Sequence, residues 1–252
     1  MAIQKTLRAF GQLLSYPSQY TAESAELLYI ILMSDVPEAA KGISAFGAFI
    51  EQHDLWEVEE AFTQTFDVNP ACALDIGWHL FGEEYARGMF LVRMREELRK
   101  HGLVETAELP DHITHVLAII GAMSDEDAGR FVRACMLPAM LKMRDALTDT
   151  GSPYSDVVSS LTTTLHHVWG AGFVLTDGSE SKHSDGSTID RGVDLLHAFP
   201  VADVHSGCGG GSCGSGCGSH AHHQHDHHQH DHQQFVPLRL HDVSDSVGSA
   251  LT

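Results

Sequence analysis

The chain has 252 residues, of which 43% are hydrophobic, and its formal net charge is −19 at pH 7. This length and apolar content suffice for one sizeable core. The negative charge repels nucleic acid and anionic lipid and favours a basic partner. We therefore expect no nucleic-acid partner.

Composition divides the chain near residue 175. Apolar residues recur at helical spacing up to Val174, whereas Gly, Ser, His and Asp dominate after Thr176. Acidic residues outnumber basic ones by 24 to 12 up to Leu175 and by 10 to 3 beyond it. The second part has too little apolar surface to offset the entropy cost of ordering. The sequence thus predicts a helical domain over residues 1–175 and a low-complexity, disordered tail over residues 176–252.

The sequence contains no recognisable signal peptide or membrane span. The N-terminus, MAIQKTLRAFGQLLSYP, lacks a long apolar core and a small-residue cleavage site. No run approaches the roughly 18 apolar residues of a transmembrane helix. We expect a cytoplasmic protein that does not insert directly into a membrane.

Helices are predicted over most of the first 66 residues. Apolar residues at helical spacing indicate a first helix from Ile3 to Leu14, which ends before Pro17 because the residue preceding proline avoids the α region. The same pattern predicts three further helices, over residues 20–33, 37–53 and 55–66.

A long helix is predicted next, over residues 78–100. It follows a break at Asn69-Pro70, and Gly102 is expected to end it. The apolar residues expected to share one face of this helix are Phe81, Tyr85, Met89 and Val92.

The remaining helices are predicted from their start signals. One is expected to begin at Asp111, whose carboxylate would accept free backbone N–H groups of the first turn. Ser124 and Asp127 predict a cap for the following helix, which is expected to kink at Pro138. Pro153 begins the last helix. Because no alternating strand pattern occurs, the sequence predicts an all-α protein with a single helical bundle.

The sequence carries no motif of a known catalytic type. Nucleophile elbows, phosphate loops and dinucleotide fingerprints are absent, and Cys72 and Cys135 are interpreted as small buried hydrophobes. His79, His112 and His115 form the alternative hypothesis of a metal-dependent hydrolase site. Such sites normally have a fuller set of His and carboxylate ligands. We therefore expect a non-enzymatic protein.

Two aromatic residues and an arginine suggest binding. Trp78 and Phe81, near Glu83 and Glu84, would form an aromatic and acidic wall for a basic amphipathic helix. Arg87 is a further candidate binding residue. The alternative is that the aromatic residues belong to the core and that Arg87 is solvated.

Several short motifs occur in a fixed order between residues 3 and 173. They are Leu13-Leu14-Ser15-Tyr16-Pro17, Thr65-Phe66-Asp67, Leu74, His79-x-x-Gly82, Arg87-Gly88-Met89, His101-Gly102 and Glu108-Leu109-Pro110-Asp111-His112. In this combination the chain resembles the assembly chaperones of molybdenum enzymes. It is most similar to the nitrate reductase delta-subunit (NarJ) type, within the wider TorD/DmsD-like redox enzyme maturation chaperones.

This resemblance implies an all-helical cytoplasmic chaperone that binds the N-terminal region of a molybdopterin-containing catalytic subunit and holds it for cofactor insertion. The corresponding loop in such proteins is associated with leader binding, which assigns client binding to Asp111, His112 and Glu108. A carboxylate at Asp111 would accept a charge-assisted contact from a client arginine. The resemblance implies no cofactor of the chaperone's own, and it is compatible with a homodimer.

The sequence departs from the family pattern between Gly82 and Gly88. Tyr85 occupies a position where the pattern has a second arginine. The expected client is therefore nitrate reductase or a relative that acts on another substrate.

Residues 205–232 have the composition of a metal-binding segment. They include nine His, three Cys and two Asp among Gly and Ser. Imidazole and thiolate suit nickel, zinc, copper or cobalt, but the cysteines lack the C-x-x-C pairing of a structural zinc site. A flexible chelator of nickel or zinc is expected, which makes metal storage or delivery the alternative function; the other interpretation is metal binding without physiological use. The predicted ligands are Cys208, Cys213, Cys217, His220, His222, His223, His225, His227, His228, His230 and His232.

Overall fold

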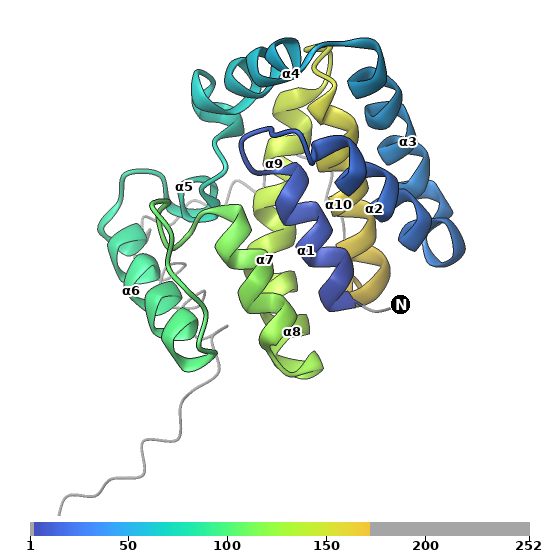
Figure 1. Cartoon of the computed structure of the whole chain (residues 1–252). Helices are drawn as coiled ribbons and strands as arrows, with labels where there is room; N and C mark the ends of the chain where they lie inside the picture. The colour runs from blue at the N-terminus through green and yellow to red at the C-terminus, as the bar shows by residue number, and fades with distance from the viewer. Residues whose placement is uncertain (1–2, 172–252) are drawn as a thin grey trace, which may run out of the picture. The chain divides into compact units, whose positions relative to one another are not determined.

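The computed structural model describes residues 3–171 of the chain. These residues form helices joined by loops and include no strand, which confirms the all-α prediction for this part of the chain (Figure 1). The α-helices are α1 (Ile3–Leu13), α2 (Thr21–Asp35), α3 (Pro37–Gln52), α4 (Leu55–Phe62), α5 (Ile76–Phe81), α6 (Tyr85–Lys100), α7 (Ile113–Ala122), α8 (Asp125–Phe131), α9 (Leu137–Leu147) and α10 (Tyr154–Trp169).

The predicted tail, residues 176–252, lies outside the described residues. Its boundary at residue 175 therefore stays a prediction. Within residues 3–171, none of the helices has the length and apolar character needed to cross a lipid bilayer.

The last helix, α10, contributes a central part of the core. It packs against α3 and α9, while α1 packs against α2 and α7 (Figure 1). The Tyr154 ring, at the start of α10, contacts the rings of Phe46, Phe62 and Phe66, with centroid distances of 4.8, 5.6 and 5.1 Å. All four rings are buried. Burial of one such side chain contributes about 1.5–3 kcal/mol, so this aromatic cluster ties the start of α10 to α3 and α4.

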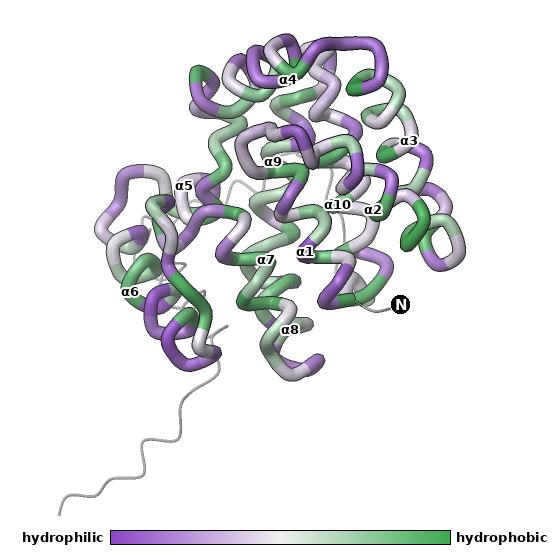
Figure 2. Tube along the Cα trace, viewed as in Figure 1, coloured by the Kyte–Doolittle hydropathy of each residue, from purple (hydrophilic) through white to green (hydrophobic). Residues whose placement is uncertain are grey.

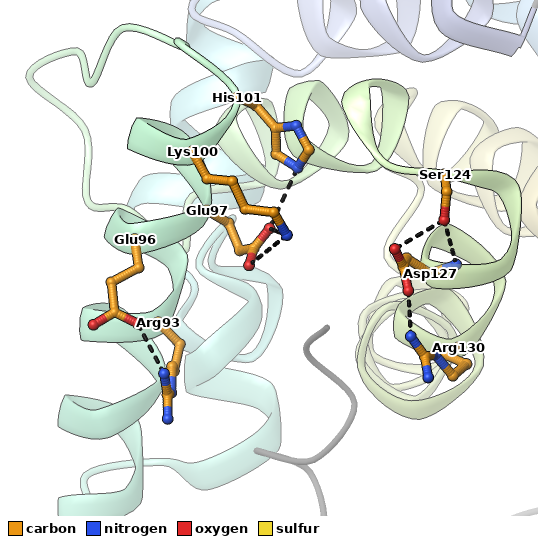
Figure 3. Close-up of polar contacts among 8 residues, drawn as sticks. All are labelled: Arg93, Glu96, Glu97, Lys100, His101, Ser124, Asp127 and Arg130. Atoms are coloured by element: carbon orange, nitrogen blue, oxygen red, sulfur yellow. Dashed lines mark hydrogen bonds and ion pairs between the residues drawn. The ribbon is translucent and has the colours of Figure 1, made fainter. Parts of the chain in front are cut away.

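Local signals predicted several helix ends correctly. Ser124 Oγ accepts the backbone N–H of Asp127 at 3.2 Å and begins α8, which confirms the predicted cap (Figure 3). Gly102 follows α6 with φ of 64°, a conformation that favours glycine. In the last turn of α6, Glu97 pairs with Lys100 and lies 3.3 Å from Nε2 of His101 (Figure 3).

The prediction of one long helix over residues 78–100 is wrong. Gly82, with φ of 58°, breaks it into α5 and α6. The break changes the helical phase, so the buried residues of α6 include Phe90, Met94 and Leu98. Tyr85 is 85% exposed, and Met89 and Val92 are exposed as well, so the predicted shared face does not exist. A positive-φ glycine starts a new helix whose apolar face need not continue the first one.

The predicted cap at Asp111 is also wrong. His112 begins α7, and its Nδ1 accepts the backbone N–H of Thr114. An isolated antiparallel bridge joins Asp75 and His112 and pairs the segment before α5 with the segment before α7. Asp111 is thereby turned into the interior, where its side chain cannot cap α7.

Two π-helical turns interrupt the predicted α-helices. The first, η1 (Thr63–Asp67), follows α4, and the second, η3 (Val132–Met136), joins α8 to α9. The helix predicted to kink at Pro138 is interrupted just before this residue by η3, and Pro138 lies in the first turn of α9. A π turn adds one residue per turn and shifts the side-chain phase. In η1 it leaves Phe66 buried and the next residue, Asp67, exposed.

Candidate functional site

A surface cavity of about 570 Å³ gathers residues from four separate parts of the chain. They come from the loop after α1, from α4 with η1, from the segment before α5, and from the α6–α7 loop with the start of α7. The lining residues are Ser15, Tyr16, Phe62, Phe66, Asp67, Ala73, Leu74, Asp75, Thr106, Glu108, His112 and Thr114.

Aromatic rings form one wall of this cavity. Phe62 and Phe66 contact each other edge to face, with centroids 5.0 Å apart. Tyr16 packs edge to face on Phe62 at 5.6 Å and is 58% exposed. These rings supply an apolar surface of the kind that binds an apolar side chain of a ligand.

Carboxylates give the cavity its charge. Asp67, Asp75 and Glu108 line it, whereas no lysine or arginine is among its described lining residues. Asp67 and Glu108 are exposed and form no ion pair within residues 3–171. The cavity therefore favours a ligand that carries positive charge beside an apolar group.

His112 belongs both to the cavity and to the start of α7. Its Nδ1 accepts the Thr114 N–H at 3.4 Å and lies 2.8 Å from the Thr114 hydroxyl. Burial lowers the pKa of His112 below its usual range, and the negative charges of Glu108 and Asp75 oppose this only in part. The neutral ring is therefore the form that caps α7.

We expect acid to destabilise this cap. A histidine with a lowered folded-state pKa binds fewer protons in the folded than in the unfolded protein. Its contribution to stability is therefore full above the pKa of the unfolded state, and it falls as pH decreases from that pKa toward the folded-state pKa. A protonated Nδ1 is a donor and cannot accept the Thr114 N–H, a loss of about 1 kcal/mol. Urea unfolding at about pH 7.5 and about pH 5.5 measures this change.

The matched variants for that measurement are His112→Asn and His167→Asn. Asparagine caps a helix without titrating, so His112→Asn should lose less stability on acidification than the unmodified protein. His167 is exposed on α10, and His167→Asn should leave the pH dependence unchanged. Equal pH dependence in all three proteins would contradict the capping role.

Two segments of the cavity wall are joined through their backbones. The Ile76 N–H donates to the Asp111 carbonyl at 2.9 Å, and the Ile113 N–H donates to the Leu74 carbonyl at 2.8 Å. Arg87 links the same segments through side chains, since it donates to Asp75 Oδ2 and to Asp111 Oδ2, each at 3.2 Å. Arg87 therefore helps to fix the distance between two walls of the cavity.

Asp111 lies behind the cavity. Its side chain is 0% exposed, and its Oδ1 has no hydrogen-bond partner among the described residues. Burial and the negative charge of Asp75 raise the pKa of Asp111, and Arg87 offsets part of this rise. A Cβ added at Gly77 would lie 2.6 Å from Asp111 Oδ2, so a glycine is required there. In this conformation the Asp111 carboxylate contacts Arg87 of its own chain and is closed to a client arginine.

Trp78 and Phe81 do not form the predicted aromatic and acidic wall. Phe81 is 8% exposed and packs on Phe90 in the core, with ring centroids 5.4 Å apart. Trp78 is half-buried and donates its indole N–H to the Pro70 carbonyl, while the Arg87 guanidinium lies 5.7 Å from its ring centroid. The structure brings Trp78, Arg87 and Asp111 together, and of the predicted client-binding residues it places Glu108 and His112 in the cavity.

The three histidines of the hydrolase hypothesis have separate partners. Nε2 of His79 contacts the Ala73 carbonyl at 2.7 Å. His115 contacts the Leu109 carbonyl through Nδ1 and accepts the Thr106 N–H at Nε2, which fixes the α6–α7 loop. No group of three or more His, Cys, Asp or Glu side chains within residues 3–171 is arranged to hold a metal ion. The predicted tail ligands, Cys208 to His232, lie outside the described residues.

The two cysteines of the helical part are buried, as predicted. Cys72 and Cys135 are each 0% exposed. Burial raises the pKa of the Cys135 thiol to about 12 and raises the pKa of Cys72 as well. Thiols in this state are poor nucleophiles.

Several cavity residues were not predicted as site residues. Ser15, Tyr16, Phe66 and Asp67 all lie within the motifs that carry the family resemblance, but their local sequence suggests only helix ends. Asp75 and Thr106 belong to no such motif. What these residues share is their position, because each lies in a π-helical turn or in a segment between two helices.

The described features define an all-helical protein with an acidic cavity that has an aromatic wall. A family model for the nitrate reductase delta subunit matches residues 33–159, which is half of the chain. The chain belongs to the nitrate reductase delta subunit family, whose members are assembly chaperones of molybdenum enzymes rather than catalytic subunits. No curated protein matches the sequence. The matched range excludes Ser15 and Tyr16, which the fold places in the same cavity as the family loop.

Proposed function

We propose that this protein is a client-specific chaperone that binds a basic N-terminal segment of the catalytic subunit of a molybdenum oxidoreductase, nitrate reductase or a relative. It holds this segment in the cytoplasm while cofactor is inserted and the enzyme assembles. The proposal requires no cofactor in the chaperone. The observation that supports it is the cavity, where Glu108 and His112 of the family loop lie with Asp67 and the aromatic wall.

The cavity suits a peptide with a cationic residue next to an apolar one. An arginine or lysine of the client would contact the free carboxylates of Asp67 and Glu108, which is a charge-assisted interaction. An apolar client side chain would pack on Tyr16 and Phe62. The acidic surface, which follows from a net charge of −19, would accelerate encounter with such a segment.

Arg87 and Asp111 have a positioning role in this proposal. The ion pairs of Arg87 hold Asp75 and the segment before α7, so the cavity keeps its shape without a ligand. This differs from the role that the family resemblance implies for Asp111, because the buried carboxylate stabilises the wall and does not contact the client.

Calorimetric titration with synthetic N-terminal peptides tests this function. The peptides should come from the molybdoenzyme subunits encoded beside this gene, with scrambled peptides of the same composition as controls. One native peptide should bind, and its scrambled form should not. Absence of binding to every neighbouring subunit would overturn the proposal.

We also propose that residues 205–232 bind nickel or zinc. This supports the second candidate function, metal storage or delivery, because imidazole and thiolate groups are concentrated in one segment. A chain truncated after Thr176 should lose bound metal completely while its helical content and client binding stay unchanged. Elemental analysis, circular dichroism and peptide titration of both proteins measure this. Metal retained by the truncated chain would revive a site in the helical part.

A further inference from the structure

Helix α2 has apolar residues on both its buried and its exposed side. Leu28 and Leu32 are 0% exposed and belong to the core. On the other side, Leu27, Ile30 and Met33 are 51%, 59% and 56% exposed. Figure 2 shows the second half of α2 coloured as hydrophobic. A surface helix normally has one apolar stripe and a polar outer face, so this outer face has the character of an interface.

A groove between α2 and α3 adjoins this exposed stripe. Its volume is about 680 Å³. Tyr29 and Glu26 belong to its wall and precede Met33 and Ile30 by four residues, which places them one helical turn away on the same side. Across the groove, a Cβ added at Gly47 of α3 would meet no atom within 4 Å, so the groove is open there. The stripe and the groove form one surface, which we call the α2 surface.

The α2 surface is negatively charged, which favours a positively charged partner. Glu23, Glu26 and Glu51 line the groove, and none of them forms an ion pair within residues 3–171. No lysine or arginine is among the described lining residues. In a two-fold dimer through this surface the same glutamates would face each other, which is unfavourable. A partner with positive charge beside apolar residues is complementary to it.

We infer that the α2 surface docks a basic amphipathic helix of a partner protein. The apolar face of that helix packs on Leu27, Ile30 and Met33, and its lysines or arginines pair with the glutamates of the groove. This docking site shares no lining residue with the cavity that contains His112. The inference is therefore independent of the proposed binding of a client N-terminus.

The probe is a synthetic helix of leucine, alanine and lysine, with leucines at positions i, i+3, i+4 and i+7 and lysines beside them. Titration into the isotope-labelled full-length protein should shift the amide resonances of α2 and α3. Ile30→Glu and Glu26→Lys should each weaken binding about tenfold, because they remove apolar contact or charge complementarity. The same peptide with glutamate in place of lysine should not bind.

Val92→Glu is the matched control, because Val92 is 49% exposed on α6. It should leave the affinity for the probe unchanged. Equal weakening by Val92→Glu and Ile30→Glu, or amide shifts confined to other helices, would overturn the inference. Binding of the client N-terminal peptide should be unaffected by Ile30→Glu, so failure here is distinguishable from failure of the proposed function.

Separate measurements test two other possible occupants of the α2 surface, a second copy of the chain and a membrane. Sedimentation of the full-length protein should show no self-association through the α2 surface. Self-association that the Ile30→Glu substitution abolishes would assign this surface to a second copy of the chain. Vesicles of neutral phosphatidylcholine should not bind the protein. Vesicle binding that Ile30→Glu abolishes would assign the surface to a membrane and overturn the docking of a helix.

Discussion

Replacement of Arg87 by alanine should lower the free energy of unfolding by about 3 kcal/mol, because it removes the ion-pair partner of the buried Asp111 carboxylate. The Asp111 side chain is 0% exposed, and its Oδ1 already lacks a hydrogen-bond partner within residues 3–171. Without Arg87 the carboxylate must remain charged in the interior or take up a proton. Urea unfolding at neutral pH measures the loss.

A double-mutant cycle separates this pair from a general effect of the substitution. Asp111→Asn removes the buried charge, so Arg87→Ala should cost much less in that background. Arg95→Ala is the matched control, since Arg95 forms an exposed bidentate pair with Glu105 and its loss should cost far less stability than the loss of Arg87. A loss no larger for Arg87→Ala than for Arg95→Ala would show that the buried pair contributes little.

The Arg87→Ala substitution should also loosen the walls of the cavity. Arg87 also holds Asp75, which lines the cavity, so the two walls joined at the Asp75–His112 bridge would move apart more readily. Client-peptide affinity should therefore fall in Arg87→Ala even under conditions in which the protein stays folded. Arg87→Lys should restore part of the stability but less of the affinity, because a point charge cannot bridge both carboxylates with the same geometry.

Reversal of charge at the cavity should have the largest effect on client binding. In Asp67→Lys combined with Glu108→Lys, two attractions for a basic peptide become repulsions. Each reversal should weaken binding by about 1.4 kcal/mol, which is tenfold, so together they should weaken it roughly a hundredfold. Calorimetry with the native client peptide at low and at moderate salt measures this, and the difference should shrink as salt increases.

Glu83→Lys combined with Glu126→Lys changes the net charge by the same amount at two exposed positions outside the cavity. This control should reduce the association rate slightly and leave the affinity nearly unchanged. If both double variants weakened binding equally, the acidic surface as a whole would account for affinity and the cavity would have no special part in it.

Helix positions were largely predictable from the sequence because their signals are local. Pro37, Ser124 and Pro153 mark helix starts through backbone chemistry that needs no tertiary contact. The break at Gly82 was missed because a glycine inside an apolar periodic pattern is compatible with a continuous helix. The packing of Phe81 of α5 on Phe90 of α6 is a tertiary contact that no local signal specifies.

The candidate site was less predictable, because it depends on contacts between distant residues. Asp111 looked like a helix cap in the sequence, and the bridge between Asp75 and His112 turned it into the interior. Glu108 and His112 were predicted through the family resemblance, whereas the roles of Asp75 and Tyr16 arise from the cavity alone. The contacts that form the cavity join segments that are distant in the sequence, and no local sequence signal indicates which segments will meet.

The packing of Tyr154 has a consequence for synthesis of the protein on the ribosome. The rings of Phe62 and Phe66, which form the cavity wall, rest on Tyr154 at the start of the last helix. All residues that line the cavity are synthesised by residue 114, yet their support comes about 40 residues later. A nascent chain therefore lacks a supported wall until α10 has emerged and docked. If the cavity binds a client segment as proposed, this order would delay that binding until α10 is complete.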